Sequence, residues 1–317
     1  MKDSAEMSIT EARMSQSSLP RVRNRKRLLL LTLYLLLVPS FGMLGVFGYY
    51  PAFSALLHAF YDWHPGFRST FVGLANFEQA IHDPIFIRSF WHVFLMVLVG
   101  ITVGLAVPFV VAELLVAVRN PRVQSVLKVA LIVPMALPGI VTILLWGAML
   151  EPTQGVVDQF LKTLGLPHSF NWFGSPHLAL ISIMLIGFPW VAGLPFLLYL
   201  AALQAIPSEI REAAIIDGAS VVHRLTRIDI PLVMPQTRLL VVLSIIGQMQ
   251  NLIPMLLLTQ GGPDFATMVP AGWAMDEAFT DGNWGYASAL SVILFIVMLV
   301  VSVISWILTS NRAKAYM

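Results

Sequence analysis

The sequence predicts an all-α polytopic membrane protein with six transmembrane helices, and three observations support this fold class. Of the 317 residues, 57% are hydrophobic and only 11% are charged, which is about half the charged fraction of a typical soluble domain. Six apolar segments each approach or exceed the roughly 20 residues that a membrane-crossing helix needs. The basic residues are also concentrated in alternate connections between these segments, as topology rules require.

The six predicted spans divide the chain into a membrane domain and two tails. The membrane domain covers 28–308, between tails at 1–27 and 309–317, and it includes a long polar loop at 206–235. A basic cluster precedes the first span, which is too long for a signal peptide and has no small-residue cleavage site, so we expect it to be uncleaved. The predicted spans are 28–49, 90–118, 129–150, 178–203, 239–258 and 287–308.

The distribution of basic residues predicts the orientation of the spans. Sixteen of the nineteen Lys and Arg residues lie on the side that carries both termini, whereas Arg68, Arg88 and Lys162 lie on the other side. Because basic loops stay in the cytoplasm, we expect both termini and the polar loop to be cytoplasmic. The basic cluster before the first span predicts contact with anionic membrane lipid rather than with nucleic acid.

The polar loop at 206–235 has the pattern of two short helices with a break. Ser208 is the expected N-cap of the first helix. Gly218 is expected to end that helix, since glycine tolerates the left-handed conformation at this position. A second short helix is expected at 220–227. From these signals alone the loop is a helical hairpin between two membrane spans.

The residue spacing in this loop resembles the Glu-Ala-Ala loop of ABC importer permeases. The family has Leu where this chain has Ile230, and the Ile-Pro pair at 206–207 is similar to the carbohydrate branch. The resemblance implies that the loop is a cytoplasmic coupling helix seated in a groove of the ATPase subunit, and that the fold is that of type I importer permeases. The alternative is a solvated hairpin with no docking role. The residues expected to couple to the ATPase are Glu212, Ala213, Ala214, Asp217 and Gly218.

Four further segments are similar to patterns of sugar permeases. The segment 73–77 resembles a motif that follows the first span, and Pro134 with Pro138 resembles the paired prolines of the third span. The segment 258–263, Leu-Thr-Gln-Gly-Gly-Pro, resembles the first-permease type of sugar importers, and 285–289 resembles the entry to the last span. The resemblance therefore covers most of the chain.

Polar residues inside the fifth span are the candidate substrate path. Gln248, Gln250 and Asn251 interrupt an apolar run, and neutral amides in a membrane must find partners or face a polar cavity. Sugars are recognised by neutral donors, neutral acceptors and aromatic faces, and Trp190 is a candidate stacking face. The alternatives are hydrogen bonding between helices for the amides and simple packing for the tryptophan.

The maltose-type pattern fits the fourth span less well. Permeases of that type have an amide where this chain has the apolar Ile183 and Met184. This departure argues against a maltose-like binding mode.

The sequence contains no recognisable catalytic constellation. It has no Gly-x-x-x-x-Gly-Lys-Ser/Thr loop for nucleotide phosphates and no cysteine. Its seven histidines are scattered without the spacing of a helical metal site. We therefore expect no catalytic residue, no metal and no cofactor on this chain. The resemblance to importer permeases implies that ATP-Mg is bound by partner ATPase subunits. Glu113 is the one acidic residue within a span, and we expect it to extend toward Arg119 at the membrane surface.

The chain resembles a permease subunit of a carbohydrate ABC importer, and the resemblance implies a location in a prokaryotic cytoplasmic (inner) membrane. The resemblance implies a second permease, two ATPase subunits and an extracytoplasmic sugar-binding protein as partners, and alternating access as the mechanism. One alternative is an ABC permease for a polyol or glycerol 3-phosphate. Phosphate would call for a basic residue in the cavity, and none lies at a span centre. A secondary transporter is a second alternative, but intramembrane carboxylates and internal repeats are lacking.

Overall fold

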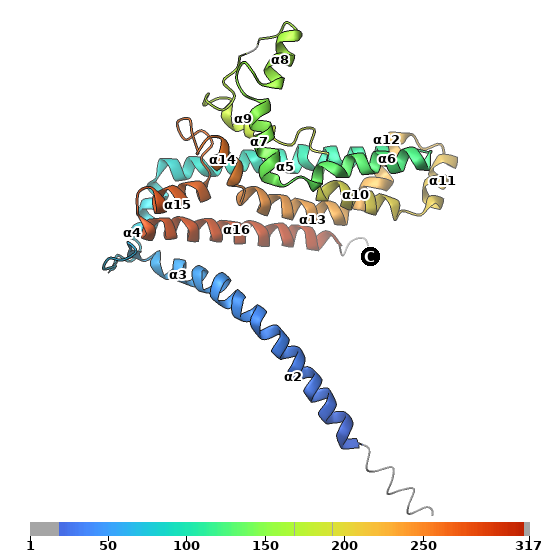
Figure 1. The fold of residues 1–317 in the computed structure, drawn as a ribbon. Coiled ribbons are helices and arrows are strands. Elements are labelled where there is room, and N and C mark those ends of the chain that lie inside the picture. The colour runs from blue at the N-terminus through green and yellow to red at the C-terminus, as the bar shows by residue number, and fades with distance from the viewer. Residues whose placement is uncertain (1–18, 168, 192, 314–317) are drawn as a thin grey trace, which may run out of the picture. The chain divides into compact units, whose positions relative to one another are not determined.

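The computed structural model describes residues 19–167, 169–191 and 193–313, most of which are helical (Figure 1). The chain divides into two compact units, Met1–Leu57 and His58–Met317. In the first unit, α2 (Leu19–Leu44) continues through the π-turn η1 (Gly45–Tyr49) into α3 (Tyr50–His58). The apolar part of this helix, Thr32–His58, is long enough to cross a membrane.

The helix α2 begins within the predicted N-terminal tail. Residues 19–27 already belong to α2, because Arg and Lys have good helix propensity and extend the helix toward the N-terminus. The predicted tail residues 1–18 lie outside the described residues.

The second unit is organised around the long helix α5 (Pro84–Val116), whose first turn is fixed by one carboxylate. Asp83 is the N-cap residue, and its Oδ1 accepts hydrogen bonds from the backbone N–H groups of Ile85 and Phe86 at 2.8 and 3.1 Å. Its Oδ2 accepts from the Trp273 indole and the Tyr286 hydroxyl, both at 2.7 Å. Asp83 therefore joins the start of α5 to α15 (Pro270–Phe279) and α16 (Trp284–Ala313).

The third predicted span is sharply bent rather than straight. It consists of α6 (Pro121–Ile132), the 3₁₀ turn η2 (Val133–Ala136) and α7 (Gly139–Met149), with an angle of 92° between its two halves. The bend lies at Leu137, which has extended backbone with ψ 134° just before Pro138. A proline disfavours the helical conformation at the residue before it and removes a backbone donor, which explains the break.

The fourth predicted span is interrupted. Its helical parts are α9 (Ala179–Met184) and α10 (Leu194–Gln204). Between them, Gly187, Trp190 and Gly193 have positive φ angles of 87°, 53° and 130°. A continuous helix over 178–203 is therefore a wrong prediction. Apolar composition alone did not reveal it, although glycines and a proline in this stretch are helix breakers.

The last two predicted spans are longer than expected. The fifth begins in the polar loop with α12 (Val221–Arg224) and the π-turn η3 (Leu225–Asp229). It then continues through α13 (Ile230–Met249) to α14 (Ile253–Leu258). The sixth is α16, which includes residues 309–313 of the predicted C-terminal tail, whereas 314–317 lie outside the described residues.

By length and apolar composition, the described residues contain four helices able to cross a membrane, or five when the bent pair counts as one span. The interrupted fourth segment is not among them.

The connections on the α4 side of the second unit contain small elements. The strands β1 (Tyr61–Asp62) and β2 (Thr70–Phe71) pair antiparallel, with Tyr61 opposite Phe71. The helix α4 (Ala75–His82) follows, and the Asn76 side chain donates to the carbonyls of Ala59 and Tyr61 at 2.9 and 3.0 Å. The helix α8 (Val156–Thr163) lies in a later connection.

Within the second unit, α5, α13 and α16 run side by side, with α11 and α12 at one end and α4 and α15 at the other (Figure 1). The apolar cluster nearest α11 and α12 joins α5, α10 and α13, which bury Leu105, Ala112, Leu115, Phe196, Tyr199, Leu200, Leu203, Val233 and Leu240. A second cluster joins α5, α9, α13, α14 and α16. A third joins α4, α5, α15 and α16. The helix α5 contributes to all three.

Candidate functional site

The polar loop folds into a helical hairpin whose turn is fixed by Gly218. Its first helix is α11 (Ser208–Ile216), with Asp217 as C-cap. The Gly218 N–H donates to the Ile215 carbonyl at 3.0 Å, and the Ala219 N–H donates to the Ala214 carbonyl at 2.9 Å. These two bonds form a Schellman motif, which needs a left-handed residue at Gly218. Its φ is 72°, so the predicted helix stop is confirmed.

The two helices of the hairpin have different N-caps. Pro207, with φ −54° and ψ 138°, is the residue before α11, so Ser208 is its first helical residue and the predicted N-cap is wrong. Ser220 caps α12, because its hydroxyl accepts a hydrogen bond from the His223 N–H at 3.2 Å. The chain then passes through η3 into α13 without interruption. The second hairpin helix is thus the beginning of a long helix, not an isolated short one.

The hairpin exposes apolar side chains at its turn. Ile215 and Ile216 are 64% and 84% exposed, and Val221 and Val222 are 66% and 71% exposed. Glu212 and Asp217 are also exposed, as is Ala213, whereas Ala214 is buried. We call the four exposed apolar residues together the hairpin tip. A cluster of branched apolar side chains between exposed carboxylates indicates a surface for another protein.

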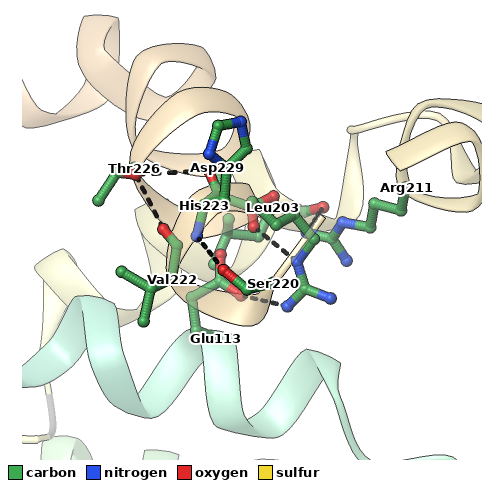
Figure 2. A network of polar contacts seen from close by, with 9 residues as sticks. Glu113, Leu203, Arg211, Ser220, Val222, His223, Thr226 and Asp229 are labelled. Atoms are coloured by element: carbon green, nitrogen blue, oxygen red, sulfur yellow. Dashed lines mark hydrogen bonds and ion pairs between the residues drawn. The ribbon is translucent and has the colours of Figure 1, made fainter. Parts of the chain in front are cut away.

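A cluster of four charged residues lies between the hairpin and the helices α5 and α10, and we call it the charge cluster. Its centre is Asp229, whose side chain is fully buried. The Arg224 Nε donates to Asp229 Oδ2 at 3.1 Å, and the Arg211 Nη2 donates to Asp229 Oδ1 at 3.4 Å. Arg211 Nη2 also donates to the Leu203 carbonyl of α10 at 3.3 Å (Figure 2). Removing one partner from such a buried pair costs about 3–5 kcal/mol.

The fourth member, Glu113, contradicts the sequence prediction. It lies near the end of α5 and is 6% exposed. Its Oε2 lies 3.9 Å from Arg224 Nη2, so its ion-pair partner is Arg224 and not Arg119. Figure 2 shows Glu113 projecting from α5 toward the hairpin. Sequence reasoning missed this pairing, although an acidic residue inside an apolar segment is by itself a signal of function.

The candidate substrate residues are only partly brought together. A cavity of about 170 Å³ is lined by Gln248, Asn251 and Trp190, together with residues of α5 and of the interrupted fourth segment. The Asn251 amide donates to Gln248 Oε1 at 3.5 Å. Gln250 does not line this cavity; it is exposed, with its amide 3.9 Å from the Met298 sulfur. The Trp190 indole donates to the Met184 carbonyl at 3.3 Å, which fixes the ring beside the cavity.

A glycine of α5 sets the position of Gln248. A Cβ atom at Gly100 would lie 2.9 Å from Ser244 Oγ and 3.1 Å from Gln248 Nε2, so α13 approaches α5 closely at this point. At Gly104, one turn further along the cavity wall, the nearest atom to such a Cβ would be the Val99 carbonyl at 3.8 Å, an ordinary contact. No pattern in the sequence indicates which glycine makes this approach.

The comparisons with known proteins agree with the predicted family. Residues 104–312 match the family model of the binding-protein-dependent transport system inner membrane component. A probable ABC transporter permease of Pyrococcus horikoshii is 31% identical over 271 residues, which cover 84% of this chain and 91% of that protein. The sn-glycerol-3-phosphate transport system permease of Yersinia enterocolitica is 29% identical over 284 residues, or 89% and 95% of the two chains.

The fold is also found in a solved transporter. One chain of a bacterial alginate ABC transporter, crystallised in complex with an alginate pentasaccharide-bound periplasmic protein, matches with a TM-score of 0.80 and 20% identity. The match covers 92% of this chain and 98% of that one. The family match extends from Gly104 of α5 through the hairpin and into α16. The chain therefore belongs to the family of inner membrane components of binding-protein-dependent transport systems, and it is an ABC transporter permease.

Proposed function

We propose that this permease imports a carbohydrate delivered by an extracytoplasmic binding protein, as one of two permeases driven by two ATPase subunits. The observation that carries the proposal is the hairpin tip, an exposed apolar surface on a loop that the charge cluster and a Schellman motif hold in shape. The chain has no phosphate-binding loop of its own. The energy of ATP must therefore reach it through contact with another subunit.

The hairpin tip is the proposed contact with the ATPase. Ile215 and Ile216 enter an apolar groove of that subunit, while Glu212 and Asp217 supply polar contacts at its edge. The exposed Ala213 keeps this face of α11 thin, so the helix approaches its groove closely, whereas Ala214, also predicted to couple, is buried against the rest of the chain. Gly218 sets the direction in which the chain leaves α11. ATP-Mg binds only to the ATPase subunits in this proposal, and this chain holds no cofactor.

The proposed topology has six spans with both termini in the cytoplasm. The bent third and interrupted fourth segments count as one span each, which agrees with the rule that irregular backbone within a membrane lies against protein or a cavity. The orientation follows from the excess of basic residues on the side of the termini. A stretch of 38 residues, Val221–Leu258, is about 57 Å long at about 1.5 Å per residue, so one end must extend beyond the bilayer.

The chemistry of the cavity supports a neutral, hydroxyl-rich substrate. Gln248 and Asn251 offer neutral donors and acceptors, Trp190 offers a ring, and the described residues that line the cavity include no charged one. The mechanism in this proposal is alternating access, in which ATP-driven movement of the hairpin reorients the helices around this cavity.

The second candidate is import of a polyol or glycerol 3-phosphate, favoured by the 29% identical Yersinia permease named for the latter. A phosphate group needs cationic partners, and none of the described residues that line the cavity is cationic. A polyol fits the same amides as a sugar, so measured binding by the cognate binding protein separates the candidates.

Labelling in intact cells tests the topology and the docking of the hairpin. The chain has no cysteine, so single cysteines at the exposed Ile216 and at Phe160, which is 61% exposed in α8, report on opposite sides. We expect an impermeant thiol reagent to label position 160 only, and a cross-linker at 216 to capture the ATPase. Labelling at 216 but not at 160 would show that the hairpin lies outside the cell and would contradict the proposed topology.

Uptake kinetics test the substrate path. Gln248→Leu or Asn251→Leu should raise the apparent transport constant for the sugar that the binding protein delivers, without loss of assembly. Gln250→Leu is the matched control, because it makes the same change on an amide outside the cavity. Equal kinetics of all three variants and the parent protein would assign the amides to helix packing.

A further inference from the structure

The charge cluster joins the hairpin to both long helices that line the cavity. Glu113 lies on α5, which also carries the cavity residues Met96 and Gly100. Asp229 immediately precedes α13, whose far end carries Gln248. From Glu113 to Gly100 is about 20 Å along a helix. The charge cluster thus lies at the hairpin ends of α5 and α13, and residues further along these two helices line the cavity.

The two helices differ in how they are attached to the hairpin. The helix α13 is continuous with α12 through η3, so it must follow any movement of the hairpin. The helix α5 does not continue directly into the hairpin, and the described residues connect the two through side-chain contacts. A polar contact is the Glu113–Arg224 ion pair at 3.9 Å. The apolar ones are contacts of residues such as Ala112 and Leu115 within the cluster shared with α10 and α13.

Arg224 contacts both carboxylates of the charge cluster. Its Nε binds Asp229, while its Nη2 faces Glu113. A guanidinium can hold two carboxylates with separate N–H groups, which a lysine ammonium does less well because it is a single point charge. Apolar packing is nondirectional and lets helices slide, whereas two carboxylates on one guanidinium fix the relative position of the helix ends.

The Glu113 carboxylate also has spare hydrogen-bonding capacity. Its Oε1 is buried and has no hydrogen-bond partner among the described residues. A carboxylate buried in this way depends on its ion pair, because a charge in a low-dielectric site is costly without a partner. Glu113 is therefore a poor residue for filling space and a suitable one for holding Arg224.

We propose that Glu113 and Arg224 are positioning residues that make α5 move together with the hairpin and α13 when ATP drives the transporter. The inference rests on the proposed function of the hairpin. In the absence of the pair, movement of the hairpin still shifts α13 but is incompletely passed to α5. The two walls of the cavity then no longer reorient together, and ATP is hydrolysed without matching import.

The test is the ratio of sugar imported to ATP hydrolysed, measured in vesicles that contain the whole transporter and its binding protein. The variants are Glu113→Gln, Arg224→Gln and the double variant. Glu151→Gln is the matched control, because it makes the same change at an exposed acid near the end of α7. We expect both single variants to lower the ratio at least about fivefold, the lower end of usual coupling between sites. The double variant should match the worse single one, since the two residues act as one unit.

Two outcomes overturn the inference: a parental ratio in both single variants, or losses that multiply in the double variant. The thiol cross-link from position 216 to the ATPase separates this failure from failure of the proposed function. When the cross-link forms and the ratio is unchanged, only the positioning role is wrong; when the cross-link is absent in the parent protein, the hairpin proposal is wrong. If Glu113→Gln does not assemble, the ratio of sugar imported to ATP hydrolysed is measured for Arg224→Lys instead. This variant keeps the positive charge but removes the guanidinium that binds both carboxylates.

Spin labels supply a second measurement that a merely stabilising role would not change. Cysteines replace the exposed Ala117, just after α5, and the exposed His223 of α12, which lies outside the hairpin tip. We expect one narrow distance between the labels with and without trapped nucleotide in the parent protein, and a broadened distance in Glu113→Gln. An equally narrow distance in both proteins counts against the inference.

Discussion

Replacing Gly218 tests whether the direction of the hairpin turn controls coupling. The φ angle of Gly218 is 72°, and an added Cβ would meet no atom within 4 Å. The cost of Gly218→Ala is therefore the backbone term alone, about 1–2 kcal/mol for an L-residue in the left-handed region. A penalty of this size lowers the equilibrium constant between the native turn and its alternatives by about 5–30-fold. Valine, which is β-branched, should cost more, and asparagine should cost less.

The assay is sugar uptake and binding-protein-stimulated ATP turnover of the reconstituted transporter. We expect Gly218→Ala to lower uptake while the subunits still co-purify, because the tip would leave α11 in the wrong direction.

The chain contains a closely matched control for this substitution. Gly165 follows α8 with a φ of 68°, and an added Cβ there would also meet no atom within 4 Å. Its N–H donates to the Lys162 carbonyl and the Leu166 N–H donates to the Leu161 carbonyl, which is the same Schellman arrangement. Gly165→Ala thus imposes the same local strain away from the hairpin. Equal uptake losses in the two variants would refute a special role for the Gly218 turn, as would parental uptake in Gly218→Ala.

Three further predictions concern other parts of the second unit. Gly100→Ala should displace Gln248 and raise the apparent transport constant, whereas Gly104→Ala should leave it near the parental value; uptake kinetics of the two variants measure this difference. Asp83→Ala should lower the free energy of unfolding by about 3–5 kcal/mol, since it removes an N-cap and strands two buried donors, whereas Asp83→Asn keeps the cap and should cost less in a thermal unfolding assay. Burial raises the pKa of Glu277, against the opposing effect of its hydrogen bond from Asn283. Between the unfolded pKa of about 4.3 and this raised value, the folded state binds more protons, so stability should fall as pH rises through that window. Glu277→Gln should flatten this part of the stability curve, and an unchanged slope would contradict the burial argument.

Local signals in the sequence determined the helical class, the hairpin and its family. The prediction at Gly218 is confirmed because a helix stop depends on a few neighbouring residues, and the left-handed position selects glycine. The spacing of Glu212 and Gly218 led to the correct permease family because that spacing reflects one short segment. The apolar segments were located correctly, although their ends shifted where basic residues extended a helix.

Tertiary structure alone decided how the segments bend and which side chains meet. Apolar composition does not distinguish a straight span from one broken at Leu137 or Gly187, because both have the same mean hydropathy. Arg119 lies close to Glu113 in the sequence, yet the partner is Arg224, more than a hundred residues away. Ion pairs between helices depend on how the helices pack, and that packing arises from the apolar clusters of α5, α10 and α13. For the same physical reason, Gln248 lines the cavity while Gln250, two positions further along the chain, does not.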